Sequence, residues 1–319
     1  MSKNEKKYNQ PTQSTNQPVD YHLPVLLRET IDALNILPDG IYVDCTFGGG
    51  GHSKEILKRL GEHGKLFAFD RDADASKNLP KDDRIVFVPH NFRHIQRFLR
   101  LHKATKVDGI IADLGVSSHQ FDEANRGFSI RFDADLDMRM DMRQSLTAFE
   151  VVNRYSEQQL HKIFEQYGEV TNSKTLARTI VHVRNATSLK SISNFKNALS
   201  AIVKGNPNKY FAQVFQALRI EVNDELGALK EMLEQAPTLL KQKGRIAVIT
   251  FHSLEDRIVK KFLKKGIFEE TEQITPFAQT ATEEPALRTV TKKPITPGQE
   301  ELKQNPRSRS AKLRVAEKA

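Results

Sequence analysis

The feature that most constrains this chain is a run of four glycines, residues 48–51, between an apolar stretch and a helical pattern. Residues 41–43 lead into Asp44 before the run, and apolar side chains recur between Ile56 and Leu60 after it. This order predicts a buried strand, a tight turn and a helix N-terminus. Glycine suits such a turn because the backbone needs unusual angles there and because a ligand must lie directly against it.

A second acid follows the next apolar stretch. Residues 65–69 precede Asp70, which stands about 20 residues after the glycine run, a spacing at which an acid commonly accepts hydrogen bonds from ribose hydroxyls. The helix N-terminus adds free N–H groups that favour an anionic ligand group. Together these features predict a pocket for a nucleoside-bearing cofactor at the edge of a parallel sheet.

The glycine spacing by itself leaves two cofactors open. Dinucleotide sites read G-x-G-x-x-G with a phosphate over the turn, whereas this run reads G-G-G-G-H-S with Asp44 before it. A carboxylate at that point repels a pyrophosphate, but it accepts hydrogen bonds from an ammonium group such as that of S-adenosylmethionine. The pattern therefore favours a methyltransferase over a dehydrogenase, and a glycine turn without a ligand leaves the two spaced acids unexplained.

Strand and helix patterns alternate through the first third of the chain, which indicates an α/β fold with a parallel sheet and helices on both faces. The expected strands are residues 41–46, 65–70, 84–88 and 107–113, and the expected helices are 51–60, 72–79 and 92–101. The rhythm breaks over residues 121–209, where the expected elements are helices at 147–153, 156–167, 173–185 and 192–204. Ser156 and Gln159 form a capping-box pattern, and the segment is interpreted as a helical insertion.

The sheet pattern then resumes. Apolar residues at three- and four-residue steps predict one amphipathic helix from Phe215 to about Lys243. A strand at 245–251, a helix at 254–265 with Ser253 as its N-cap, an extended loop at 268–306 and a last strand at 311–316 are expected to follow.

Charge and cysteine content indicate the partners and the compartment. The formal net charge is +9, and residues 286–319 hold nine Lys or Arg against three Glu, which indicates a nucleic-acid partner before a membrane, although a solvated surface explains the same charge. Cys45 is the only cysteine, which excludes an intrachain disulfide. Residues 1–20 are polar without periodicity and are expected to be a disordered tail. With no signal-peptide or membrane-span pattern, a cytoplasmic protein is expected.

No bound metal is expected. The acidic stretch 133–137 begins like an EF-hand loop, but Met138 stands where Gly is required and Gln144 where Glu is expected. The sequence instead predicts an ion-pair network between these acids and Arg131, Arg139 and Arg143.

Eight motifs occur in order from about residue 21 to the C-terminus: 22–27 (HLPVLL), 44–53 (DCTFGGGGHS), 113–118 (DLGVSS), 126–129 (RGFS), 136–141 (LDMRMD), 215–220 (FQALRI), 251–257 (FHSLEDR) and 305–314 (NPRSRSAKLR). Together they resemble the bacterial RsmH (MraW) family, which methylates the N4 amino group of a cytidine in the decoding region of 16S rRNA. The resemblance implies a Rossmann-like class I methyltransferase sheet with an inserted helical domain, S-adenosylmethionine as cofactor, and 16S rRNA, within the small ribosomal subunit, as partner.

The resemblance also implies an organisation and a cofactor site. Residues 21–120 and 210–319 would form the methyltransferase domain, and residues 121–209 would form the inserted substrate-recognition domain. Asp70 would hold the ribose and Phe92 would lie against the adenine, although core packing explains Phe92 equally well. The full set of implied cofactor-binding residues is Gly50, Gly51, His52, Asp70, Phe92, Asp113 and Gln120.

Asp113 is the leading catalytic candidate. The cytosine amino nitrogen is a poor nucleophile because its lone pair is delocalised, and a carboxylate that accepts its N–H bonds would favour attack. Amino-methyltransferases often carry prolines and an aromatic residue after this acid, whereas Leu114-Gly115-Val116 follow here, so a purely cofactor-binding role stays open. His252 is the second candidate, for contact with the base or the RNA backbone, and its alternative is a structural helix cap.

Four basic residues of the tail are candidates to meet RNA phosphates or to lock the tail onto the core: Arg307, Arg309, Lys312 and Arg314. Residues 134–135, 168–172 and 209–214 depart from the patterns common in the family, so its detailed RNA contacts are not transferred to this chain. Two other functions remain open at this point: an amino-methyltransferase that acts on another base, and a ribosome-assembly factor whose cofactor pocket is vestigial.

Overall fold

The computed structural model describes residues 24–268 and 285–319. The expected disordered tail, residues 1–20, lies outside the described residues, as does the central part of the expected loop at 268–306.

The described residues form a seven-stranded sheet with the order β3-β2-β1-β4-β5-β7-β6. Its strands are β1 Ile41–Asp44, β2 Lys65–Phe69, β3 Ile85–Val88, β4 Val107–Asp113, β5 Leu240–Thr250, β6 Leu287–Thr289 and β7 Lys312–Lys318. The first five strands pair in parallel, as the alternating pattern predicted, while β7 runs antiparallel to β5 and to β6. The central strands are buried on both faces, which explains their near-continuous apolar sequences.

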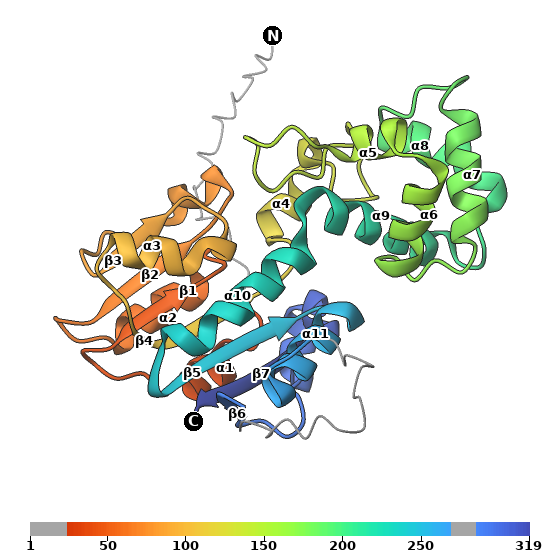
Figure 1. Cartoon of the computed structure of the whole chain (residues 1–319). Coiled ribbons are helices and arrows are strands. Elements are labelled where there is room, and N and C mark those ends of the chain that lie inside the picture. Colours follow the sequence, from red (N-terminus) through yellow and green to blue (C-terminus); the bar gives the residue numbers. More distant parts are fainter. Residues whose placement is uncertain (1–23, 269–284) are drawn as a thin grey trace, which may run out of the picture.

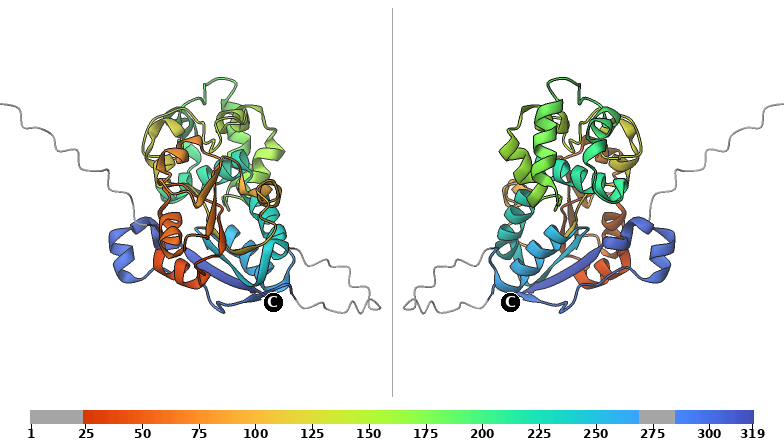
Figure 2. Two further views of the ribbon diagram at one scale, coloured as in Figure 1. Left: turned by 90° about the vertical axis from the view of Figure 1, so that its left-hand side faces the viewer. Right: turned by 90° about the vertical axis from the view of Figure 1, so that its right-hand side faces the viewer.

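Helices cover both faces of the sheet (Figure 1 and Figure 2). On one face, α1 (Leu27–Leu34) and α2 (Gly51–Arg59) bury their apolar sides against β1, β2, β4, β5 and β7. On the other face, α3 (Ile95–Leu101), α10 (Glu225–Leu239) and α11 (Ser253–Lys265) pack against the same sheet. The α/β class with helices on both faces is thereby confirmed.

A helical lobe follows β4 and stands beside the sheet (Figure 1). Its elements are α4 Ser118–Asp122, η3 Ala124–Arg126, α5 Ala148–Arg154, α6 Glu157–Gln166, α7 Ser173–Val183, α8 Ile192–Leu199, η4 Ser200–Ile202 and α9 Pro207–Asn223. The lobe has a hydrophobic core of its own, which runs from Phe128 to Val222 and is centred on Phe164, Phe195 and Val214. The capping box between Ser156 and Gln159 is present at the start of α6.

The single helix expected over 215–243 is wrong. Two helices, α9 and α10, meet at Asp224, which adopts the left-handed conformation with φ 44°. The apolar period continues through the break because α9 packs into the lobe core and α10 packs against the sheet. The apolar period therefore indicated the buried faces of both helices but did not indicate the turn between them. Strand β5 also begins at Leu240, before the expected start.

Smaller differences follow from local packing. Residues 73–78 and 92–94 form 3₁₀ helices, η1 (Ala73–Asn78) and η2 (Phe92–His94), where α-helix was expected. The expected loop at 268–306 contains strand β6 and helix α12 (Gln299–Gln304), and 3₁₀ helix η5 (Pro306–Ser310) follows it. The Glu301 carboxylate of α12 accepts a hydrogen bond from the Leu26 N–H, 2.9 Å away, which ties the C-terminal segment to α1. Of the described helices, none has the length and apolar character that a bilayer crossing requires.

Candidate active site

Three acids meet at the carboxyl edge of the parallel strands. Asp44 ends β1, Asp70 follows β2 and Asp113 ends β4, and these three strands are neighbours in the sheet. The carboxyl edge is where ligands bind in open α/β sheets, so the three acids mark the candidate site.

Asp44 braces the glycine turn. Its carboxylate is buried and accepts hydrogen bonds from the Ser53 hydroxyl at 2.7 Å and from the Thr46 N–H at 3.0 Å. Burial raises the pKa of Asp44, and these hydrogen bonds partly offset that effect. The two carboxylate oxygens of Asp44 therefore link the residues on either side of the glycines and stabilise the turn.

The first residue of α2 must be glycine. A Cβ on Gly51 would lie 2.1 Å from Pro24 Cγ, well inside van der Waals contact. The segment before α1 thus presses directly on the glycine turn, although the two are separated by more than twenty residues in sequence. This close approach brings Pro24, in the described part of the 22–27 motif, against the 44–53 motif.

His52 lies beneath the turn and faces Asp113. Its Nε2 donates a hydrogen bond to the Val25 carbonyl at 3.1 Å, so the Nδ1 lone pair points to Asp113 Oδ2, 3.7 Å away. Burial lowers the pKa of His52 to about 4, so the ring is neutral at physiological pH. His52 does not cap α2, because the N-cap position is Gly50, in a left-handed conformation.

Asp113 is held by its backbone, and one oxygen of its carboxyl group has no hydrogen-bond partner among the described residues. Its N–H donates to Thr46 Oγ1 at 2.7 Å, and no described residue donates a hydrogen bond to the buried Oδ1. Burial raises the pKa of Asp113 well above its ordinary value, and the negative charges of Asp44, Glu255 and Glu301 raise it further. The protonated form can donate to His52 Nδ1, whereas an ionised Asp113 faces only a lone pair there.

Asp70 holds the loop that follows β2. Its Oδ2 accepts from the Gly48 N–H and its Oδ1 from the Asp72 N–H, both at 2.8 Å. Burial raises the pKa of Asp70 to about 6, even though both hydrogen bonds lower it. Asp70 is therefore in contact with the glycine turn and lies where the sequence placed the ribose acceptor.

The two remaining expected cofactor residues lie on opposite flanks. Phe92 begins η2 after β3 and packs, half-buried, against the core of the sheet. Gln120 of α4 is buried, and its side chain is already engaged: Nε2 donates to Asp72 Oδ2 at 2.7 Å, and Oε1 accepts from the Ser117 N–H at 3.2 Å. A cavity of about 20 Å³ lies between Asp70, Asp72 and Gln120.

His252 caps α11. Its Nδ1 accepts from the Glu255 N–H at 3.4 Å, and Glu255 in turn accepts from the Phe251 N–H at 2.8 Å. The expectation of Ser253 as N-cap is therefore wrong, because the helix begins at Ser253 itself. His252 still belongs to the site edge, since β5 pairs Ile249 with Asp113 and ends two residues before it.

The basic tail residues differ in their surroundings. Arg314 is buried in β7 and pairs with Asp256 at 2.7 Å, and Lys312 reaches the same carboxylate at 3.3 Å. Arg307 pairs with Asp122 of α4 at 2.5 Å, with its guanidinium over the Phe121 ring. Arg309 is exposed.

Two arginines of the expected ion-pair network, Arg139 and Arg143, form separate local pairs. Arg139 pairs with Asp137 at 2.7 Å and Arg143 with Asp141 at 2.8 Å, each two residues earlier in the chain. Asp133 instead accepts from the Ser193 N–H at 2.9 Å.

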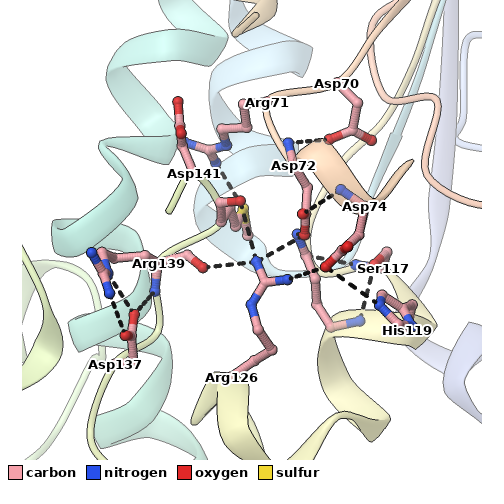
Figure 3. Close-up of polar contacts among 12 residues, drawn as sticks. Asp70, Arg71, Asp72, Asp74, Ser117, His119, Arg126, Asp137, Arg139 and Asp141 are labelled. Atoms are coloured by element: carbon pink, nitrogen blue, oxygen red, sulfur yellow. Dashed lines mark hydrogen bonds and ion pairs between the residues drawn. The ribbon is translucent and has the colours of Figure 1, made fainter. Parts of the chain in front are cut away.

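Sequence reasoning missed a cluster between the site and the helical lobe (Figure 3). Asp72 accepts from Gln120 and pairs with Arg126 at 2.8 Å, next to Asp70. Arg126 opens one of the eight motifs, which was a signal, but its partners are distant in sequence. The side chain of Asn223, which joins the same cluster through Met140, carried no signal.

Topology and site together define a class of protein. A parallel sheet with the antiparallel strand β7 beside β5, and with acids after three neighbouring strands around a glycine turn, is the architecture of a Rossmann-like methyltransferase that uses S-adenosylmethionine. The residues fit this donor: the turn approaches without side chains, Asp70 offers an acceptor, and Asp113 Oδ1 is unpartnered among the described residues.

The chain belongs to the MraW methylase family, whose model matches residues 20–319. It is 53% identical to the ribosomal RNA small subunit methyltransferase H of Flavobacterium johnsoniae, over 94% of this chain and 98% of that protein. It is also 53% identical to the protein of the same name from Bacteroides thetaiotaomicron, over 93% and 97% of the two chains. The resemblance inferred from the eight motifs is confirmed, and the dehydrogenase alternative is excluded.

Donor binding is expected to depend on pH through Asp70. With Asp70 as the expected ribose acceptor, ribose hydroxyls would donate to the ionised carboxylate, and ionisation follows a pKa of about 6, so affinity for S-adenosylmethionine should rise with pH through that value. The dissociation constant is expected to be about tenfold larger at pH 5 than at pH 7. Titration calorimetry measures it, with Asp70→Asn as a weaker binder whose affinity is independent of pH. Equal affinity of the unaltered protein at both values contradicts the prediction.

Proposed function

We propose that this protein transfers a methyl group from S-adenosylmethionine to the N4 amino group of a cytidine in the decoding region of 16S rRNA. The observation that carries the proposal is the Asp113 carboxyl group, at the carboxyl end of β4, with an unpartnered buried Oδ1 and a raised pKa. The name shared by the relatives supports small-subunit rRNA as the substrate. The resemblance supports the choice of cytidine N4.

In this proposal Asp113 acts directly on the target amine, and His52 accepts a hydrogen bond from Asp113 afterwards. When bound, S-adenosylmethionine supplies an electrophilic methyl group. Asp113 accepts hydrogen bonds from the amino group, which localises the nitrogen lone pair, and it takes the proton that leaves as the N–C bond forms. The raised pKa of Asp113 makes it a stronger base than an exposed carboxylate. Once protonated, Asp113 can donate to His52 Nδ1, the lone pair that faces it.

The same proposal assigns the two parts of the chain. Residues 21–120 and 210–319 carry donor binding and methyl transfer, and residues 121–209 recognise the RNA. The separate core of the helical lobe, which follows β4, supports a division of this kind, and that core extends past residue 209 to Val222 of α9. The assembled small subunit is proposed as the partner, in the cytoplasm. His252 is proposed to contact the target nucleotide, and its position at the same sheet edge as Asp113 supports this role.

The test is transfer of labelled methyl from S-adenosylmethionine to small ribosomal subunits that lack the modification, with mapping of the product by mass spectrometry. N4-methylcytidine at one decoding-region site is the expected result. A methyl group on another base would identify a different amino-methyltransferase. Donor binding without transfer to any small-subunit RNA would favour an assembly factor.

The basic tail is proposed to bind RNA phosphate through Arg307, Arg309, Lys312 and Arg314. Strand β7 begins at Lys312, opposite Thr250 at the carboxyl end of β5, so the preceding residues lie at the site edge. Arg309 is exposed there, whereas Arg314 is held by Asp256. Arg309 is therefore the residue of the four that is best placed to reach a phosphate.

Arg309→Ala is expected to weaken RNA binding and to reduce the slope of log affinity against log salt by about 1, because one phosphate contact is lost. Filter binding over a range of salt concentrations measures both values. Arg288→Ala removes the same charge at the opposite edge of the sheet, where Arg288 lies opposite Glu317, and should leave the slope unchanged. The prediction fails if the two variants show the same slope.

A further inference from the structure

The loop after β2 joins the donor site to the helical lobe (Figure 3). Asp70, the proposed ribose acceptor, is bonded to the Asp72 N–H at 2.8 Å. The Asp72 carboxylate is buried and accepts from Gln120 Nε2 at 2.7 Å and from Arg126 Nη2 at 2.8 Å. Two residues beyond the ribose acceptor, the loop is therefore fastened to α4 and η3.

The Arg126 guanidinium extends this connection into the lobe. Its side chain is only 10% exposed, and Nη2 also donates to the Arg139 carbonyl at 3.1 Å and to the Met140 carbonyl at 3.3 Å. Its Nη1 reaches Asp74 Oδ2 at 3.4 Å. One buried side chain thus holds the donor loop and the 139–140 segment in fixed relation.

Asn223 completes a closed set of hydrogen bonds, the circuit, which joins the donor loop, Arg126, the 139–140 segment and the end of α9. Its Oδ1 accepts from the Met140 N–H at 2.8 Å, and its Nδ2 donates to the Met138 carbonyl at 2.7 Å. Arg71 of the donor loop donates to the Asn223 carbonyl at 2.8 Å. Asn223 is the last residue of α9, directly before the turn into α10. Both chain connections between the lobe and the sheet are therefore bonded to the loop that carries Asp70.

The cavity beside Asp70 adjoins this circuit at Asp72 and Gln120. One wall is the donor loop, with Asp70 and Asp72, and the other is the start of α4, with Ser117 and Gln120. A ligand group that enters the cavity touches both walls at once.

We propose that Arg126 is a positioning residue that transmits occupancy of the donor site to the helical lobe, so that bound S-adenosylmethionine fixes the lobe in the orientation that receives RNA. The proposal rests on the proposed function for the identity of the donor and of the RNA. Donor binding at Asp70 restricts the motion of the loop. Through the hydrogen bonds of Arg126 the 139–140 segment becomes restricted as well, and through those of Asn223 so does the end of α9. Because coupling is reciprocal, bound RNA tightens donor binding by the same factor.

The test is hydrogen exchange of the full chain with and without S-adenosylhomocysteine, the product form of the donor, in the absence of RNA. The Met140 amide is the reporter, because it donates to Asn223. In the unaltered protein the ligand is expected to slow its exchange about tenfold. In Arg126→Lys, which keeps the charge beside Asp72 but cannot span to both carbonyls, the ligand should still protect the donor loop and should leave Met140 unprotected.

Two further variants make the outcome decisive. Arg71→Lys removes the second link, to Asn223, and should show the same loss if Arg126→Lys does not fold. Arg178→Met removes an arginine that is 70% exposed within the lobe and should behave like the unaltered protein. Ligand protection of Met140 that survives in Arg126→Lys overturns the proposal, as does its absence from the unaltered protein.

A kinetic measurement separates positioning from simple loss of structure. Arg126→Lys should lower kcat/KM for the RNA about tenfold, while the dissociation constant of S-adenosylmethionine measured without RNA stays within about twofold. Equal losses for both substrates would indicate a structural role and overturn the proposal. Failure of the unaltered protein to methylate rRNA would count against the proposed function, and the exchange experiment would still decide the coupling.

Discussion

Asp113→Asn is expected to lower the rate of methyl transfer by about 10²- to 10⁴-fold, with the dissociation constant of S-adenosylmethionine within about threefold of its original value. The amide keeps the size of the side chain and can still accept one hydrogen bond, but it cannot take the proton from the amine. The measurement is single-turnover transfer to small subunits, beside calorimetric titration of the donor. In the unaltered protein the rate should rise with pH through the raised pKa of Asp113, because only the carboxylate accepts a proton.

Folding stability provides the control for this variant. Because burial disfavours the ionised form of Asp113 in the folded protein, folding free energy is lost as the pH rises from the ordinary carboxyl pKa to the raised one, so the neutral amide should leave the free energy of unfolding unchanged or higher. Asp70→Asn should instead weaken donor binding, whereas Asp113→Asn should mainly slow methyl transfer. If Asp113→Asn loses donor binding and transfer together, Asp113 binds the donor and another group assists the amine.

Gly127→Ala is expected to destabilise the protein by about 3 kcal/mol, from two causes that add. Gly127 has φ 72°, a conformation that costs a residue with a Cβ about 1 kcal/mol. The new Cβ would also lie 2.5 Å from the Asp135 carbonyl and 3.0 Å from the Asp137 N, and backbone atoms yield less readily than side chains. Overpacking of this kind costs about 1–3 kcal/mol. Chemical denaturation followed by circular dichroism measures the change.

Gly205 offers a matched control for the backbone contribution. It has the same φ of 72°, but a Cβ there would meet nothing within 4 Å. Gly205→Ala should therefore cost about 1 kcal/mol, and the difference between the two variants reports the clash alone. Equal destabilisation by both would show that the Asp135–Asp137 segment moves aside freely and that Gly127 does not fix it.

The expectations that succeeded came from local signals. The strand that ends at Asp44, the glycine turn and the helix after it form one continuous segment of chain, and β4 was placed at its observed bounds, residues 107–113. The Ser156 capping box joins groups three residues apart. The cofactor and RNA residues remain predictions until they are tested, although Asp70, His52 and Asp113 all lie around the glycine turn.

The sequence by itself determined the family, the α/β rhythm, the helical insertion and the acids at the strand ends, because backbone preference and apolar period are properties of neighbouring residues. The tertiary structure alone decided the turn at Asp224, the antiparallel pairing of β6 and the pairing of Arg314 with Asp256. It also decided the circuit through Asp72, Arg126, Met140 and Asn223. Those contacts join polar groups tens of residues apart, and burial selects their partners only after the sheet and the lobe have packed.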